Sequence, residues 1–466
     1  MVLNSDGTRK PFRKQKPSID RPAGRSAPVK PGLQARAAAA KILAAVVDRK
    51  LPLDGALDQE HGNPAYKALG ESDRALVRAI LNTTLRHLPR IDAAIASLLE
   101  SPLPEGARAL HHVLSIGAAQ ILYLDVPDHS AVDLAVEQAN QDPRNRRFAK
   151  LVNAVLRRLG REKDAVLAEI SRVAPMPAWF LGRLEMAYGR DAALAISQSQ
   201  LEPAAIDLTV KSDAESWAKR LNGVALPTGG VRLAAFDGSI PSLGGFDEGA
   251  WWVQDAAASI PARLFGDLSG KRAADLCAAP GGKTAQLILA GGAVTALDQS
   301  ESRLRRLRSN LDRLGLKAET VAADLTTFKP AEGFDAILLD APCSSTGTTR
   351  RHPDVLWTKG PEDIARLAAL QERLLRHALT LLKPLGTLVF SNCSLDPAEG
   401  EEVVARVLSD TDAIKRVPIS AGDWPGLEAA ITPLGEFRTL PTMLKMPEGI
   451  ASGLDGFYAA VLRRAG

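Results

Sequence analysis

The chain has 466 residues, of which 45% are hydrophobic and 24% are charged, and its formal net charge is +4. This length exceeds what one hydrophobic core organises, so we expect several domains. No apolar run approaches the roughly 18 residues of a membrane span, and the polar N-terminus lacks the apolar segment of a signal peptide. We therefore expect a cytoplasmic protein with no membrane partner. Three cysteines, an odd number, argue against a disulfide framework.

The N-terminal segment carries the net positive charge of the chain. Residues 1–30 contain eight Lys and Arg against two Asp, so they contribute +6 and the rest of the chain contributes −2. Five prolines lie among or directly after these charges. The composition predicts a disordered basic tail over residues 1–34, which is either a solubilising segment or an arm that contacts phosphates.

Residues 35–165 show helical spacing throughout, which predicts an all-α domain. Apolar residues from Ile42 to Val47 share one face of the first helix, and a second predicted helix runs from Arg74 to Leu88 and ends before Pro89. Its histidines have no partners at metal-ligand spacing. A dense basic group is either an RNA-facing surface or a solvated face, and it consists of Arg144, Arg146, Arg147, Lys150, Arg157 and Arg158.

Three stretches of this region, residues 35–47, 72–86 and 151–158, together resemble the NusB-like RNA-binding domain found at the N-terminus of some bacterial rRNA methyltransferases. The resemblance implies that the helical domain contacts RNA.

A mixed region follows, and we expect a small α+β connecting subdomain over residues 166–249. Pro177–Phe180 opens a helical stretch and Ile206–Val210 has the pattern of a short strand. Beyond it, strand-like apolar runs alternate with helical patterns. This order predicts a C-terminal α/β Rossmann-like domain with a mostly parallel sheet over residues 250–466.

The stretch Ala273–Thr284 predicts a strand, a Gly-rich turn and the start of a helix. Adjacent glycines, Gly281 and Gly282, let backbone approach a ligand closely, and a helix N-terminus offers unpaired N–H groups. Such a turn suits the carboxylate of a nucleoside amino acid as well as a phosphate. Neither a dinucleotide G-x-G-x-x-G motif nor a Walker motif is present.

Three aspartates, Asp298, Asp324 and Asp340, end the strands that follow this turn. An acid after the second strand of a doubly wound fold accepts ribose hydroxyls, which is the role expected of Asp298. Asp324 is placed to accept an adenine amino group. A helix cap is the structural alternative for any one of them, but three in succession favour a nucleoside pocket.

Two cysteines lie just beyond neighbouring strand ends. Cys343 follows the predicted strand Phe334–Leu339 and Cys393 follows Thr387–Phe390, so both thiols and Asp340 should converge at one crevice. Carbon 5 of cytosine is a weak nucleophile, and methylating it requires a thiolate to add first to carbon 6. A nearby carboxylic acid would bind or protonate the ring at its N3 edge. Either thiol is positioned to attack.

Residues 252–458 resemble the RNA cytosine-5 methyltransferase family, whose bacterial member with a NusB-like N-terminus methylates 16S rRNA. The resemblance implies an S-adenosyl-L-methionine cofactor, 16S rRNA as the partner, Cys393 as the nucleophile, Cys343 as the residue that assists release, and Asp340 as a further catalytic group. We expect no metal and a monomer. The implied cofactor-binding residues are Cys277, Ala278, Ala279, Pro280, Gly281, Gly282, Lys283, Asp298, Asp324 and Asp340.

Two features depart from this pattern. Asn392 stands where the family has Thr before its nucleophile, and an insertion separates Arg438–Pro441 from Asp455. Two other functions remain open. One is the same chemistry on tRNA, and the other is a non-catalytic RNA-binding assembly factor.

Overall fold

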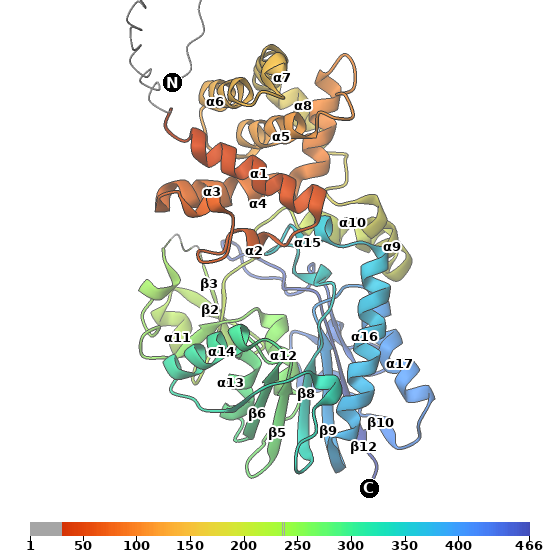
Figure 1. The fold of residues 1–466 in the computed structure, drawn as a ribbon. Helices are drawn as coiled ribbons and strands as arrows, with labels where there is room; N and C mark the ends of the chain where they lie inside the picture. The colour runs from red at the N-terminus through yellow and green to blue at the C-terminus, as the bar shows by residue number, and fades with distance from the viewer. Residues whose placement is uncertain (1–29, 235, 237) are drawn as a thin grey trace, which may run out of the picture.

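The computed structural model describes residues 30–234, 236 and 238–466, so residues 1–29 of the expected tail lie outside the described residues. Figure 1 shows a layer of helices above a domain built on a large twisted sheet. The first helix begins at Leu33, inside the segment predicted as tail. Within the described ranges, no helix is long and apolar enough to cross a membrane.

The N-terminal domain is entirely helical, as predicted. Its helices are α1 (Leu33–Arg49), α2 (Leu53–Ala56), α3 (Pro64–Lys67), α4 (Glu71–Leu98), α5 (Arg108–Tyr123), α6 (Asp128–Gln141), α7 (Ala149–Arg161) and α8 (Lys163–Ile170). Val166 and Ile170 of α8 are buried in the same core as α5 and α7. The helical domain therefore extends beyond residue 165, where the sequence pattern had placed its boundary.

The predicted end of the second helix at Leu88 is wrong, because α4 continues through Pro89 to Leu98. A proline inside a helix removes one backbone hydrogen bond and destabilises the helix by about 3 kcal/mol. Beyond the proline, Ile91, Ala94 and Ile95 are fully or almost fully buried in the domain core. Packing of this downstream face keeps the chain helical.

A connecting region joins the helical domain to the large sheet. It contains α9 (Ala178–Tyr188), α10 (Arg190–Ser199), β1 (Asp207–Val210), α11 (Ala214–Arg220), β2 (Gly223–Ala225), β3 (Gly230–Leu233) and β4 (Trp251–Val253). The four strands form an antiparallel sheet in the order β2-β3-β1-β4. Because β4 pairs with β1 and buries Trp251, this sheet extends past the boundary expected at residue 249.

The C-terminal domain has the predicted α/β alternation. Its elements are α12 (Ala256–Arg263), β5 (Arg272–Leu276), α13 (Gly282–Leu289), β6 (Ala293–Asp298), α14 (Glu301–Arg313), β7 (Glu319–Ala322), β8 (Phe334–Asp340), α15 (Val355–Thr358), α16 (Pro361–Thr380), β9 (Leu382–Asn392), α17 (Glu401–Ser409), β10 (Ile414–Arg416), β11 (Phe437–Thr439) and β12 (Phe457–Arg464).

The strands form one sheet in the order β10-β12-β9-β8-β5-β6-β7, with β11 also paired to β12. β7, β6, β5, β8 and β9 are parallel, whereas β12 runs antiparallel to β9. β9 is longer than the predicted Thr387–Phe390, because Leu382 already pairs with Phe334 before a register shift. The order is that of a Rossmann-like sheet with an antiparallel edge.

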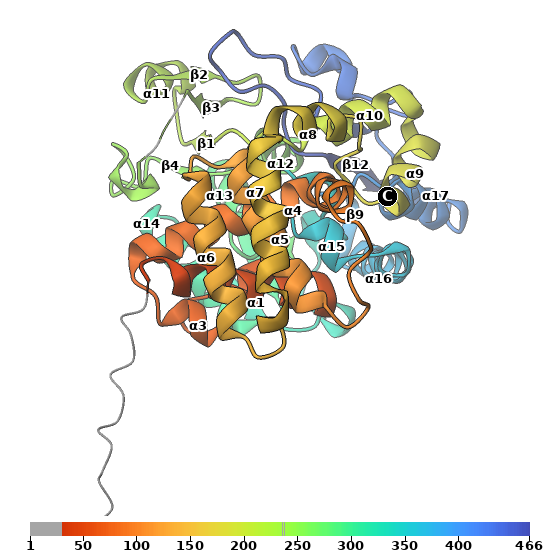
Figure 2. The ribbon, with the colours of Figure 1, turned by 90° about the horizontal axis from the view of Figure 1, so that it is seen from above.

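Helices cover both faces of this sheet, since side chains alternate between the faces along each strand. Ala274 and Leu276 of β5 pack with α16 and α17, while Ala273 packs with α12 and α13 on the other face. Because the five strands β7, β6, β5, β8 and β9 are parallel, their carboxyl ends all lie at the same edge of the sheet, where they border one crevice. In Figure 1 this edge faces the helical domain, and in Figure 2 the helices lie over the middle of the molecule.

Direct bonds join the helical domain to the segment that follows β8. The Trp357 indole Nε1 on α15 donates to the Leu85 carbonyl of α4 at 2.9 Å. Leu53 N donates to Asp354 Oδ2 at 3.0 Å, and Arg86 Nη2 donates to the Arg350 carbonyl at 3.0 Å. The segment after Cys343 is thus attached to the N-terminal domain.

Candidate active site

The Gly-rich turn joins β5 to α13 and requires unusual backbone angles. Cys277 has φ 68° and Gly281 has φ 102°, both in the left-handed region. A Cβ atom on Gly281 would lie 2.9 Å from Leu307 Cγ, so the turn accepts only glycine there without displacement. Two side chains of α14 hold the turn from outside, because Arg303 Nη2 donates to the Ala279 carbonyl at 2.7 Å and Asn310 Nδ2 donates to the Pro280 carbonyl at 2.9 Å.

Asp298 ends β6 directly beside this turn and is buried. Its Oδ1 accepts the Ser300 N–H at 3.0 Å, and its Oδ2 lies 3.3 Å from the Ala279 nitrogen and 3.1 Å from Arg303 Nη1. These donors fix the direction of the carboxylate. It also lines the crevice, as expected of a group that receives ribose hydroxyls.

Asp324 differs from Asp298, because it is exposed and caps a short 3-10 helix, Leu325–Thr327. Its Oδ1 accepts both the Thr326 N–H at 2.9 Å and the Thr326 hydroxyl at 2.8 Å. These two bonds lower the pKa of Asp324. Asp324 therefore acts as a helix cap, which was the structural alternative, and its side chain also lines the crevice.

The crevice is a cavity of about 710 Å³ at the carboxyl ends of the parallel strands. Its wall includes Cys277 and Ala279 from the turn and the three aspartates at the ends of β6, β7 and β8. The volume lies within the range of about 300–1,000 Å³ usual for ligand pockets. A cavity of this size, lined by apolar and acidic side chains, fits an adenosyl group joined to an amino acid.

Asp340 ends β8 and forms an ion pair inside the crevice. Its Oδ2 accepts from Lys283 Nζ at 2.8 Å, and its Oδ1 accepts from the Ser391 hydroxyl at 2.9 Å. Burial alone would lower the pKa of Lys283, but the adjacent Asp340 carboxylate raises it above its ordinary value. Lys283 is thus a charged ammonium directed toward the strand ends, not only a part of the cofactor turn.

The two predicted thiols meet in the wall of the same cavity. Cys343 Sγ and Cys393 Sγ lie 3.5 Å apart, within hydrogen-bonding distance. The bond to Cys393 and burial together raise the pKa of the Cys343 thiol well above its ordinary value. Cys343 is therefore protonated at neutral pH and can donate a hydrogen bond to Cys393 Sγ. Cys277 is separate from the pair, and burial raises its pKa to about 12.

Asn392, which departs from the family pattern, shapes the turn that carries Cys393. Its Oδ1 accepts the Ser394 N–H at 2.9 Å, and its Nδ2 donates to the Glu399 carbonyl at 2.6 Å. Asn392 is fully buried. Its amide closes the turn around the thiol, so the substitution leaves Cys393 facing the cavity.

Several residues of the site lay outside the sequence prediction. Arg373 and His377, one turn apart on α16, line the cavity, and Arg303 binds both the turn and Asp298. On a helix, such charges have the pattern of a solvated face, so the sequence carries no local signal of their position. Glu399 bonds the segments after both cysteines, as described below.

Comparisons with known proteins agree with this architecture. The family model described as 16S rRNA methyltransferase RsmB/F matches residues 268–463, and the NusB family model matches residues 33–161. The ribosomal RNA small subunit methyltransferase B of Vibrio vulnificus (strain YJ016) is 35% identical over 449 residues, which span 92% of this chain and 99% of that protein. The chain belongs to the RsmB/F family.

The relative of the same name from Klebsiella pneumoniae subsp. pneumoniae is 33% identical, with 94% of this chain and 100% of that protein covered. The crystal structure of PH0851 superimposes with a TM-score of 0.70 over 94% of this chain and 99% of that chain. At 21% identity it establishes the shared fold alone. Membership of the RsmB/F family confirms the predicted methyltransferase activity, the NusB-like domain and S-adenosyl-L-methionine as the cofactor.

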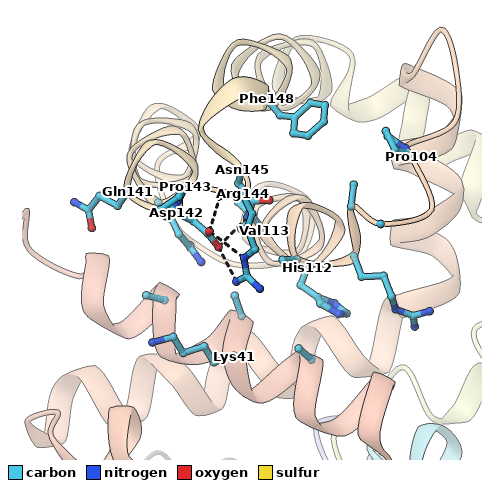
Figure 3. Close-up of a pocket in the computed structure, with 18 of the residues that line it drawn as sticks. Lys41, Pro104, His112, Val113, Gln141, Asp142, Pro143, Arg144, Asn145 and Phe148 are labelled. Carbon is cyan, nitrogen blue, oxygen red and sulfur yellow. Dashed lines mark hydrogen bonds and ion pairs between the residues drawn. The ribbon is translucent and has the colours of Figure 1, made fainter.

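A second cavity, of about 1170 Å³, lies in the NusB-like domain between α1, α5 and the segment that joins α6 to α7 (Figure 3). Of the predicted basic surface, Arg144 and Arg147 line it, together with Lys41 of α1. Arg144 is paired with Asp142 at 3.0 Å, and the Arg147 guanidinium lies 4.6 Å from the centre of the Phe148 ring. The basic side chains flank a half-apolar groove.

Proposed function

We propose that this protein forms 5-methylcytosine in 16S rRNA through a covalent bond between Cys393 and carbon 6 of the target cytosine. The observation that carries the proposal is the pair of thiols 3.5 Å apart beside the cofactor cavity. Methylation of an amino group needs no covalent adduct, so it gives no reason for two adjacent thiols.

Each thiol has a separate role in this proposal. The Cys393 thiolate adds to carbon 6, and electron density moves to carbon 5 and the N3 edge, where the Lys283–Asp340 pair supplies a proton or a hydrogen bond. The cofactor supplies the methyl group that carbon 5 accepts. A base then takes the carbon 5 proton, the electron pair of that C–H bond restores the ring double bond, and the bond to Cys393 breaks. Cys343 assists this release by donating to the departing thiolate.

Preference for 16S rRNA rests on the relatives, whose names state the small-subunit ribosomal RNA as their substrate. The NusB-like domain and its basic groove support an RNA partner. A cytosine must leave its stack to present carbon 6. The groove and the crevice would then hold different parts of one RNA.

The test is a pair of cysteine variants. Cys393→Ala should abolish methyl transfer and the covalent RNA adduct. Cys343→Ala should still attack and methylate but fail to release, so a protein–RNA species that survives denaturing electrophoresis should accumulate. The double variant is the control, because it should trap nothing. If Cys393→Ala traps RNA and Cys343→Ala forms no adduct, the two roles are reversed.

Substrate identity needs a separate experiment. Bisulfite sequencing of total RNA from a deletion strain, with and without the restored gene, should show one 16S rRNA cytosine that depends on the protein. A dependent cytosine in tRNA alone would contradict the proposed substrate but retain the chemistry. Absence of any dependent 5-methylcytosine would contradict both.

A further inference from the structure

A fully buried carboxylate, Glu399, lies between the two thiol-bearing segments, and the proposed chemistry does not use it. Its Oε1 accepts the Ser344 N–H at 2.8 Å, and its Oε2 accepts the hydroxyls of Ser344 and, at 2.6 Å, of Ser394. Ser344 directly follows Cys343, and Ser394 directly follows Cys393. One carboxylate thus bonds the residue after each thiol.

The residues before the two cysteines are hydrogen-bonded to Glu399 or to its partner Gln371. Gln371 of α16 donates its Nε2 to Glu399 Oε1 at 3.0 Å and to the Pro342 carbonyl at 3.0 Å. Asn392 Nδ2 donates to the Glu399 carbonyl at 2.6 Å. Both neighbours of each cysteine are therefore attached to Glu399, directly or through Gln371.

The carboxylate is held by hydrogen bonds alone. In the part of the chain that the structure describes, Glu399 forms no ion pair, and burial raises its pKa. A buried carboxyl with no cation is costly unless its oxygens are saturated with donors, and here four donors reach them. Packing does not require a carboxylate at this position, because an apolar side chain of similar size would fill the space with a smaller free-energy penalty.

We propose that Glu399 is the positioning residue of the thiol pair, holding the segments after β8 and β9 so that both sulfurs can act on one cytosine. The inference rests on the proposed two-thiol chemistry. The two segments follow different strands and would otherwise shift independently. A carboxylate suits this task because its two oxygens accept from both segments at once.

The principal test is Glu399→Gln, which preserves shape but replaces one acceptor oxygen with a donor. We expect kcat to fall about 100-fold, as for a misplacement of about 1 Å at a reacting centre. The KM for RNA and the cofactor affinity should remain unchanged, because Glu399 is not among the residues that line the cavity. In the Cys343→Ala background, the adduct should form correspondingly more slowly.

A readout without methyl transfer keeps this test separate from the proposed function. Diamide oxidises two neighbouring thiols to a disulfide, accepting their two electrons and two protons, and the rate reports how often the sulfurs meet. Cross-linking of Cys343 to Cys393 should be about 10-fold slower in Glu399→Gln than in wild type. Equal cross-linking rates with equal kcat would overturn the positioning role.

Two further variants distinguish a loss of positioning from a folding defect. Glu436→Gln removes another fully buried carboxylate, which pairs with Arg416 and not with Ser344 or Ser394, and it should change neither the cross-linking rate nor the kcat. If Glu399→Gln does not fold, Ser344→Ala combined with Ser394→Ala removes the two hydroxyl bonds to Glu399 Oε2 and should slow cross-linking. If no variant forms an RNA adduct but Glu399→Gln still slows cross-linking, the proposed function fails and the positioning role stands.

Discussion

Three aspartates that look equivalent in the sequence have different partners in the folded protein. Asp298 is buried and fixed by Arg303 and two backbone N–H groups, Asp324 is exposed and caps a short helix, and Asp340 pairs with Lys283. The set of donors around each carboxylate therefore decides its role. Only Asp298 and Asp340 are held by a cation.

The first prediction concerns Asp298. Asp298→Asn keeps the shape of the side chain but loses the charge that strengthens bonds to ribose hydroxyls. Cofactor affinity by calorimetry should fall by roughly 10- to 100-fold, which corresponds to about 1.5–3 kcal/mol for a hydrogen bond to a charged group. RNA affinity should stay at the wild-type value. Unchanged cofactor affinity would remove Asp298 from the ribose site.

The second prediction concerns Asp275, which is buried beneath the Gly-rich turn and accepts the Thr284 hydroxyl at 2.6 Å. Burial raises its pKa from 3.8 to about 7. The folded state binds this proton more tightly than the unfolded state, so the contribution is fully present below about pH 4 and is lost as the pH rises toward 7.

Asp275→Asn cannot titrate, so its unfolding free energy should depend less on pH. Each pKa unit corresponds to about 1.4 kcal/mol, so the wild type should lose a few kcal/mol more than the variant between about pH 4 and pH 8. Urea unfolding at both pH values measures the difference. Identical losses in the two proteins would show that Asp275 is not the responsible group.

At the scale of elements, the proline in α4 has a definite consequence. A proline at position 89 cannot donate to the carbonyl four residues earlier, which belongs to Leu85. That carbonyl instead accepts the indole N–H of Trp357, on α15 of the catalytic domain. The interruption inside one helix thereby supplies an acceptor for the contact between two domains.

The third prediction follows because the Trp357 indole N–H takes the place of the helical N–H that Pro89 lacks. Trp357→Phe should destabilise the protein by about 1–3 kcal/mol, because it leaves the buried Leu85 carbonyl without a donor. In a Pro89→Ala background the helix supplies its own N–H, so the same substitution should cost about 1 kcal/mol less. Trp217→Phe, on α11, is the matched control and should have equal effects in both backgrounds. If Trp357→Phe destabilises the protein equally in both backgrounds, the Trp357 indole does not compensate for the N–H that Pro89 lacks.

At the scale of the whole molecule, the chain combines a NusB-like helical domain with the crevice of the methyltransferase domain. The parallel strands of the catalytic sheet end on the side that faces the NusB-like domain (Figure 1). The bonds from Trp357, Leu53 and Arg86 fix the two domains at the segment that follows Cys343. Under the proposed function, RNA bound to the helical domain would therefore lie near the thiols.

The fourth prediction concerns the basic groove of Figure 3. Arg147→Ala should weaken RNA binding and reduce the slope of log affinity against log salt by about 0.7, the value for one lost single-strand phosphate contact. Arg158→Ala is the matched control, because Arg158 is already paired with Glu162 at 2.9 Å. A slope that does not change in either variant would exclude the groove as a phosphate contact.

Local patterns were sufficient for the order of elements and for the fold class. Hydrophobic spacing predicted the helical domain, the α/β alternation and the strand ends that carry Asp298, Asp340, Cys343 and Cys393. The predictions failed where tertiary packing outweighs a local signal, as at Pro89 in α4. Local patterns also do not show that α8 and β4 join cores formed by residues distant in the sequence.

The sequence alone determined which reactive groups the protein has and that they follow parallel strands, since strand and turn signals are local. Only the tertiary structure decided the distances between them. The 3.5 Å separation of Cys343 and Cys393, the Lys283–Asp340 pair and the bonds of Glu399 each join residues separated by many others in the chain. Such contacts depend on sheet register and on burial, and no local pattern of residues encodes either.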